Sequence, residues 1–186
     1  RTTAFATAGN GMRVLTGYGE HGFDFDPGPG IHELEYGVWL LALDPDGSTA
    51  WLVEGYAAPG QTEAASASSD YLAVTPSGGV LIAGYANGNL EFEGPNGDFD
   101  LVTPYGPTYW TSSYLLMIDP TGQPRWAHLL QGGWIGGTGI SASGVAAMSG
   151  YFESGLTAQR DTGAESLTSN GSYDCYSLQV TPNGAF

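Results

Sequence analysis

Lysine is absent from this 186-residue chain, and only four arginines face nineteen acidic residues. The formal net charge is therefore −15 at pH 7. Nucleic acids and anionic membrane surfaces attract proteins through clustered basic side chains, so the composition argues against both as partners. A charge of this sign favours high solubility and suits a salty or cation-rich exterior.

Cysteine and long apolar runs are also scarce. Cys175 is the one cysteine, which excludes a disulfide within the chain. Because it lies in the alternating run Asp174–Val180, we expect a small buried side chain rather than a nucleophile. The longest apolar run, Val38–Leu43, is far too short to cross a bilayer, so we expect no membrane insertion. The chain begins with Arg1 rather than methionine, which is compatible with removal of a signal peptide or of a longer precursor segment.

Glycine and proline, in contrast, are plentiful. Thirty glycines and eleven prolines disfavour helices, and no segment shows an apolar period of 3.6 residues. The apolar content of 41% nevertheless argues against disorder. A chain of this length buries roughly two thirds of its unfolded surface, which is enough for a stable core. The sequence therefore predicts an all-β protein with many short strands.

One recurring pattern joins an apolar strand, an Asp-Pro-x-Gly turn and an aromatic residue four positions after the glycine. It occupies Trp39–Trp51 and Tyr114–Trp126, and Tyr176–Phe186 carries a degraded copy with the turn Thr-Pro-Asn-Gly. In such a turn the aspartate bonds its own backbone, the proline presets φ and the glycine tolerates the left-handed region. Each copy therefore predicts a strand, a tight turn and the start of a second strand.

A second pattern is an apolar strand that ends in a Gly-Tyr pair. Its glycines, Gly17, Gly84 and Gly150, are 67 and 66 residues apart. Together the two patterns predict about four antiparallel strands per repeat in up-and-down order, which is one blade of a β-propeller. A sandwich of sequential hairpins is the alternative architecture.

The repeats divide a single repeat domain into residues 1–55, 56–130 and 131–186, the last repeat being incomplete. Tyr56–Ser69 and Gln131–Gly137 are polar or rich in glycine, so we expect them to link successive repeats.

These motifs resemble a known family. Tyr71–Tyr85, Phe23–Gly30, Leu167–Val180 and both Asp-Pro-x-Gly turns with their tryptophans are similar to the repeats of bacterial seven-bladed β-propeller-type proteins. The resemblance implies a propeller-type fold and a secreted or cell-surface location. The family has no common catalytic residues, so the resemblance implies no reaction, and we expect no enzyme. Three residues replace the strand lysine of the family: Ala42, Met117 and Gln179.

Two acidic pairs are candidate metal ligands, Asp24 with Asp26 and Glu91 with Glu93. The pairs hold corresponding positions in the first two repeats, and the i, i+2 spacing puts both carboxylates on one face of a strand. Hard cations such as calcium prefer several oxygens of this kind. The alternative is the solvated face of an amphipathic strand. We expect no cofactor, with calcium as the one candidate.

Four aromatic residues lie outside the repeated patterns: Tyr105, Tyr109, Trp110 and Trp134. Exposed aromatic rings beside acids and amides are typical of sugar-binding or protein-binding surfaces, so these four are candidate ligand-binding residues. The alternative is ordinary packing between repeats. The histidines lack metal-ligand spacing and no nucleophile motif appears, so the sequence names no catalytic residue.

The sequence therefore favours a non-enzymatic extracellular module, structural or adhesive, that is secreted or held on a bacterial cell surface. The third repeat stops at Phe186, before the aromatic strand that completes the other two. We expect an open sheet edge that pairs with another copy, or with the remainder of a longer chain, to form an oligomer or filament. Two alternatives are a lectin-like module that binds carbohydrate or protein, and the propeller portion of a secreted hydrolase or lyase.

Overall fold

The computed structural model describes residues 1–19, 23–25, 31, 33–34, 37–57, 66–101, 112–160 and 163–186. The described residues form fifteen strands joined by turns, with no helix among them. The predicted all-β class is confirmed. The strands make two antiparallel sheets and a small ribbon, and within the described ranges the sheets do not close into a ring.

The first sheet has the strand order β1-β2-β5-β6-β9-β10. Its first four strands run up and down in chain order, whereas β9 and β10 are a hairpin from later in the chain. A separate ribbon pairs β3 with β4. The bounds are β1 Thr2–Thr7, β2 Arg13–Gly19, β3 Phe23–Asp24, β4 Glu33–Leu34, β5 Gly37–Leu43, β6 Thr49–Ala57, β9 Leu90–Gly94 and β10 Gly97–Leu101.

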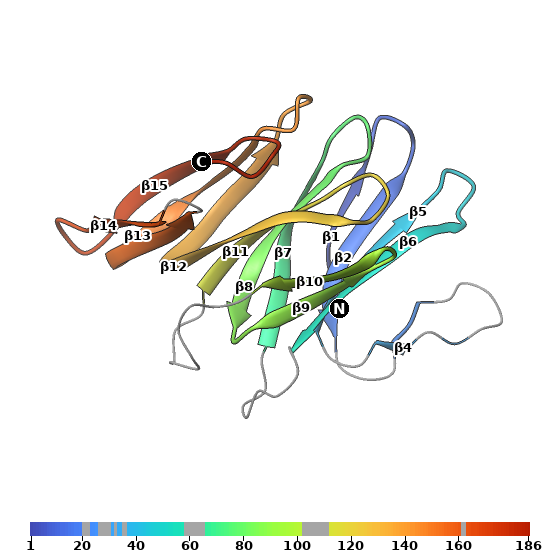
Figure 1. Ribbon diagram of the computed structural model, residues 1–186, viewed down its shortest axis with the longest axis horizontal. Coiled ribbons are helices and arrows are strands. Elements are labelled where there is room, and N and C mark those ends of the chain that lie inside the picture. The colour runs from blue at the N-terminus through green and yellow to red at the C-terminus, as the bar shows by residue number, and fades with distance from the viewer. Residues whose placement is uncertain are drawn as a thin grey trace.

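The second sheet has the order β14-β13-β12-β11-β8-β7, and β15 also pairs with β13. The strands β7, β8, β11 and β12 again run up and down in chain order. Figure 1 shows the blue and cyan strands of the first sheet on one side, β7, β8 and β11 in the centre, and β13 to β15 on the other side. The bounds are β7 Ser66–Val74, β8 Val80–Asn87, β11 Ser112–Ile118, β12 Pro124–Ile140, β13 Ala146–Arg160, β14 Gly163–Thr168 and β15 Asp174–Val180.

Two apolar cores hold these layers together, and β8 supplies both. Val80 and Ile82 enter the core against the first sheet, whereas Leu81 and Ala83 enter the core against β13 and β15. A strand buried on both faces is expected to read as a continuous apolar run, as Val80–Ala83 does. The first core also takes Val14, Val38, Leu40, Trp51, Val53, Leu90, Phe92, Tyr114, Leu116 and Leu129. The second also takes Leu115, Trp126, Leu130, Ile135, Met148, Phe152, Leu156, Tyr176 and Val180.

The Asp-Pro-x-Gly turns form as their residues predict. In the turn after β11, Gly122 has a φ of 86° and its N–H donates to the Asp119 carbonyl at 3.0 Å. The Asp119 carboxylate accepts the N–H groups of Thr121 and Gln123 at 2.8 and 3.1 Å. Burial acts to raise the pKa of Asp119, but a hydrogen bond from the Thr121 hydroxyl, these two N–H groups and the Arg125 charge together outweigh it and hold that pKa below its ordinary value. The turn after β5 repeats the backbone geometry, with a φ of 95° at Gly47 and a hydrogen bond of 2.9 Å from its N–H to the Asp44 carbonyl. There, however, the Asp46 carboxylate accepts the Ser48 N–H, at 3.0 Å.

The inserts between the second and third strands of a repeat reach back to an earlier strand. The hairpin β9–β10 lies between β8 and β11 in the chain, yet β9 pairs with β6, with Phe92 opposite Gly55. The second half of β13 makes the same connection to β12, with Ala158 opposite Leu130. Each hairpin therefore extends the sheet formed by the strands that precede its own repeat.

Three local expectations were wrong. Gln131–Gly137 is not a link, because β12 runs without a break through it and pairs with β13 through two bulges. Its glycines allow close approach: a Cβ at Gly133 would lie 2.6 Å from Leu156 Cδ1. Ser66–Ser69 belongs to β7 rather than to a link. Cys175 is exposed rather than buried, because its neighbour Tyr176 points into the second core and Cys175 faces the opposite side.

Candidate functional site

The face of the third repeat that points away from the second core is polar. We call it the outer face; its exposed members on β13 and β15 are Ser149, Tyr151, Cys175, Ser177 and Gln179. Alignment of the Gly-Tyr pairs and of the turns assigns each of them a counterpart in the second repeat. Those counterparts are Ala83, Tyr85, Ser113, Leu115 and Met117, of which all but Tyr85 and Met117 are fully buried. The outer face therefore differs in both polarity and exposure from the matching face of the second repeat.

Three aromatic rings lie together at this end of the molecule. Trp134 of β12 is opposite Tyr151 of β13 in the ladder, and their ring centroids are 5.3 Å apart with an interplanar angle of 13°. Tyr173, just before β15, meets both rings edge-on, at 6.5 Å from Trp134 and 5.8 Å from Tyr151. The exposed fractions are 37% for Trp134, 44% for Tyr151 and 59% for Tyr173. We call these three residues the aromatic cluster.

Trp134 is thus the one candidate ligand-binding residue whose surroundings the structure describes. Tyr105, Tyr109 and Trp110 lie outside the described residues. Sequence reasoning did not single out Tyr151 or Tyr173. Tyr151 was assigned only to the Gly-Tyr pattern, and its position opposite Trp134 depends on two bulges that no local motif reveals.

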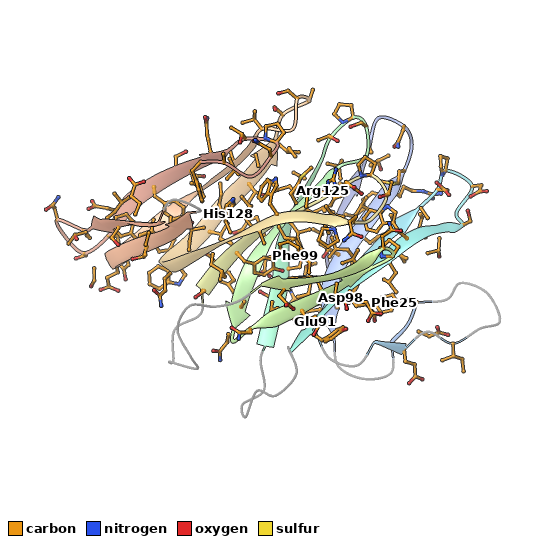
Figure 2. All side chains as sticks on the ribbon, in the orientation of Figure 1. Phe25, Glu91, Asp98, Phe99, Arg125 and His128 are labelled. Carbon is orange, nitrogen blue, oxygen red and sulfur yellow. The ribbon has the colours of Figure 1, made fainter. Side chains whose placement is uncertain are left out.

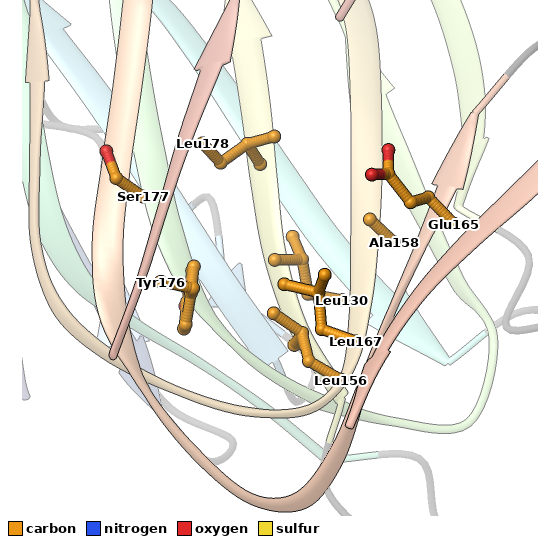
Figure 3. Close-up of a pocket in the computed structure, with 8 residues that line it drawn as sticks. All are labelled: Leu130, Leu156, Ala158, Glu165, Leu167, Tyr176, Ser177 and Leu178. Carbon is orange, nitrogen blue, oxygen red and sulfur yellow. The ribbon is translucent and has the colours of Figure 1, made fainter. Parts of the chain in front are cut away.

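A small pocket of about 100 Å³ lies beside β15. Figure 3 shows Leu130, Leu156 and Leu167 grouped together in it, with Tyr176 and Leu178 of β15 nearby. Burial raises the pKa of Tyr176 to about 12. Within the described residues, β15 pairs with β13 alone, so its other edge is free.

The second repeat shows what covers the corresponding place. There β11 pairs with β12, and the side chains of Ala127 and Leu129 pack into the first core. Leu116, the counterpart of Leu178, is fully buried as a result, whereas Leu178 stays partly exposed. Leu167 is 44% exposed. The pocket therefore marks the position that a fourth strand would fill beside β15.

The opposite end of the molecule carries an apolar ladder across the first sheet. Phe5 is opposite Leu15, Leu15 is opposite Leu41, and Leu41 is opposite Leu52, which puts all four side chains on one face. Phe5 is 59% exposed and the three leucines are partly exposed. Of their counterparts in the second repeat, Ile82 and Leu116 are fully buried in the core against the first sheet, and Leu72 and Ala127 pack against that core partly buried.

Five acids continue along the same face of the first sheet. Glu93 is opposite both Glu54 and Asp98, and Glu91 is opposite Asp100. Desolvation, and then the charges of Asp100, Asp98 and Glu93, raise the pKa of Glu91 above its ordinary value. Like charges directly opposite one another in a ladder destabilise it. Figure 2 labels Glu91 and Asp98, which lie on the two strands of the β9–β10 hairpin.

The structure brings only one pair of the proposed metal ligands together, Glu91 with Glu93 on one face of β9. Asp24 belongs to the separate β3–β4 ribbon, Glu91 and Glu93 belong to β9, and Asp26 lies outside the described residues. Glu93 accepts a hydrogen bond of 3.0 Å from the Tyr56 hydroxyl. In the part of the chain that the structure describes, no three acids, histidines or cysteines are grouped so that they could hold a metal ion.

The repeated tryptophans pack on the turn of the next repeat. Trp51 Nε1 donates to the Pro120 carbonyl at 3.1 Å, and Trp126 Nε1 donates to the Pro182 carbonyl at 3.1 Å. Both indoles are almost fully buried, at 5% and 7% exposure. The two tryptophans therefore pack between repeats, and their hydrogen-bond partners lie in turns 69 and 56 residues away.

Comparison with the models of known protein families finds no match, and a search of curated proteins finds no significant similarity. The resemblance to propeller-type repeats therefore stays a prediction. The described residues include no helix long and apolar enough to span a membrane.

Proposed function

We propose that this chain is a non-enzymatic structural or adhesive module of the β-propeller type, secreted or displayed on a bacterial cell surface, that assembles through its free sheet edge. The observation that carries the proposal is the unpaired edge of β15 beside the pocket of Leu130, Leu156 and Leu167. An unpaired edge of this kind is a template for a strand from another chain.

The occupant we propose is a strand of a neighbouring copy or of a longer parent chain. It would run antiparallel to β15 with small or apolar side chains opposite Leu178 and Tyr176, because Ala127 and Leu129 hold these places beside β11. The apolar ladder of the first sheet supplies a second surface for association. The polar outer face argues against closure of a six-repeat ring by two copies, since closure would bury it against the apolar ladder. Open assemblies are therefore favoured.

The test measures mass in solution by multi-angle light scattering at micromolar concentration, with Leu178→Arg and Gln179→Arg as a matched pair. Both residues lie on β15, but Leu178 lines the pocket and Gln179 is exposed on the other face. We expect the unmodified chain and Gln179→Arg to form dimers or larger species, and Leu178→Arg to have a lower mean mass than either because it loses association through the β15 edge. Leu167→Arg, at a more exposed pocket position, serves if Leu178→Arg does not fold. A monomer for the unmodified chain would overturn the proposal.

A further inference from the structure

Beyond assembly, we propose that the aromatic cluster of Trp134, Tyr151 and Tyr173 is a binding platform for neutral carbohydrate. The cluster lies at the end of the molecule away from the first sheet, and its three rings come from β12, β13 and the residues before β15. No single motif assembles it.

The residues at the corresponding positions of the second repeat have other contacts, so the exposure of the aromatic cluster is specific to the third repeat. Tyr85 corresponds to Tyr151, and its hydroxyl accepts the Ile135 N–H at 2.9 Å, while the Tyr71 hydroxyl donates to the Ile135 carbonyl at 2.9 Å. Aromatic residues there hold the following strand in place. In the third repeat Gly137 holds the position of Tyr71, so the hydrogen bond that the Tyr71 hydroxyl makes has no counterpart there. Trp134 holds the position of Ser68.

The surroundings of the cluster differ from the interfaces between the repeats. The interface faces of the first two repeats are largely apolar at the positions where the outer face has Ser149, Ser177 and Gln179. A following repeat packed here would bury these hydroxyl and amide groups, which costs free energy when they are left without partners. An aromatic surface set among polar side chains suits a hydroxyl-rich ligand, because rings supply contact area and polar groups supply orientation.

The ring geometry distinguishes a sugar from a cation. Trp134 and Tyr151 are in contact and nearly parallel, at 5.3 Å and 13°, which leaves no space between them for a quaternary ammonium group. Tyr173 stands at 70° and 80° to the two rings and forms a wall beside the stack. A flat ring face with a perpendicular wall fits the C–H face of a pyranose, whose polarised hydrogens are attracted to the negative face of the π-system. The absence of lysine and the net charge of −15 favour a neutral glycan over an anionic one.

The platform is preorganised, because Trp134 and Tyr151 are fixed opposite each other in the ladder. Tyr173 follows a turn in which the Asn170 N–H donates to the Asp174 carboxylate at 2.9 Å. Aromatic residues with few rotatable bonds lose little entropy on binding, so affinity comes from contact area rather than from rearrangement.

The experiment titrates the full chain, followed by tryptophan fluorescence and calorimetry, with soluble neutral oligosaccharides of glucose, mannose and N-acetylglucosamine. We expect at least one series to bind, and Tyr173→Ala and Trp134→Ala each to weaken that binding about tenfold or more. Phe5→Ala is the matched control, since Phe5 is as exposed as Tyr173, at 59%, but lies on the first sheet. It should leave binding unchanged.

Three results would overturn the assignment. The first is no binding of any oligosaccharide series at about 10 mM. The second is that Phe5→Ala weakens oligosaccharide binding as much as Tyr173→Ala does. The third is that phosphocholine, titrated as a probe with a quaternary ammonium group, binds while no oligosaccharide does. Tyr173→Ala removes an exposed side chain, so a retained melting temperature separates loss of binding from loss of folding. Trp134→Phe keeps a ring in the stack and should retain most of the affinity. The oligomeric state is measured separately, so failure of the assembly proposal leaves this test intact.

Discussion

At the scale of single residues, Gly47 and Gly122 hold the same place in two copies of one turn. Both have a left-handed φ, 95° at Gly47 and 86° at Gly122. A Cβ at Gly122 would lie 2.7 Å from the Cγ of Trp51, whereas a Cβ at Gly47 would meet only an Arg13 nitrogen at 3.9 Å. The two glycines therefore separate the cost of backbone conformation from the cost of contact with the preceding repeat.

We expect Gly122→Ala to lower the free energy of unfolding by more than Gly47→Ala does, with a difference of about 1–3 kcal/mol from overpacking against Trp51. Both variants share the strain of a left-handed alanine, which is about 1–2 kcal/mol. Urea denaturation followed by far-ultraviolet circular dichroism measures both losses. Equal losses would show that Trp51 does not pack on this turn in solution.

The residues of these turns were predictable because their chemistry is local. Proline, glycine and the aspartate carboxylate act within five positions of one another, and the expected turns formed. The exposure of Cys175 was not predictable in the same way, because alternation indicates that a strand has two faces but not which of them is covered. The same limit applies to Tyr173, whose ring partners lie on other strands.

At the scale of elements, the hairpin β9–β10 carries an unfavourable charge arrangement. Glu91 and Glu93 face Asp100 and Asp98 across the ladder. Because the pKa of Glu91 is raised, the folded chain binds this proton more tightly than the unfolded chain does. The resulting penalty is present at neutral pH, and it is relieved as the pH falls through the raised pKa toward the ordinary value of 4.5.

Glu91→Gln should therefore raise the melting temperature at pH 7 and low salt, and the gain should shrink as the pH approaches 4.5. High salt should also reduce the gain, because the carboxylates are close to solvent and are screened. Glu153→Gln, at an exposed position of β13, should show neither effect. Differential scanning calorimetry across this pH range measures the melting temperatures of both variants and of the unmodified chain. A lower melting temperature for Glu91→Gln than for the unmodified chain at pH 7 would contradict the prediction.

Strands proved easier to predict than their partners. The apolar runs before the Gly-Tyr pairs and before the turns became strands, because period and turn chemistry act over a few residues. Nothing in the sequence of Leu90–Gly94 indicates that this strand pairs with β6 rather than within its own repeat. Gln131–Gly137 was wrongly predicted to be a link because glycine usually marks a loop. Here the glycines instead allow β13 to approach β12 closely.

At the scale of the whole molecule, apolar contact surfaces coexist with a net charge of −15. Two copies repel each other at long range, whereas the apolar ladder and the free edge of β15 favour contact. The proposed assembly should therefore grow with ionic strength, because the screening length falls from about 10 Å at 0.1 M salt to about 3 Å at 1 M.

Sedimentation velocity at low and high sodium chloride concentration measures this dependence. We expect the larger species to increase with salt in the unmodified chain, and Leu178→Arg to suppress the increase. Phe5→Arg tests the ladder independently, because Phe5 is exposed and remote in sequence from β15. A mass distribution that is the same at both salt concentrations would contradict the prediction.

The inserted hairpins have a consequence for how such a chain can be cut and recombined. The unit that repeats in the sequence is not the unit that completes a sheet: the first sheet ends with β9 and β10, which belong to the second repeat. A gene divided at the sequence repeats would give one fragment with an uncovered edge at β6 and another with a hairpin that has lost its neighbour. The first sheet is complete only from β1 through β10, but a boundary after β10 would separate β8 from its partner β11 in the second sheet. The inserted hairpin therefore interlocks the two sheets, and neither boundary releases a piece whose strands all keep their neighbours.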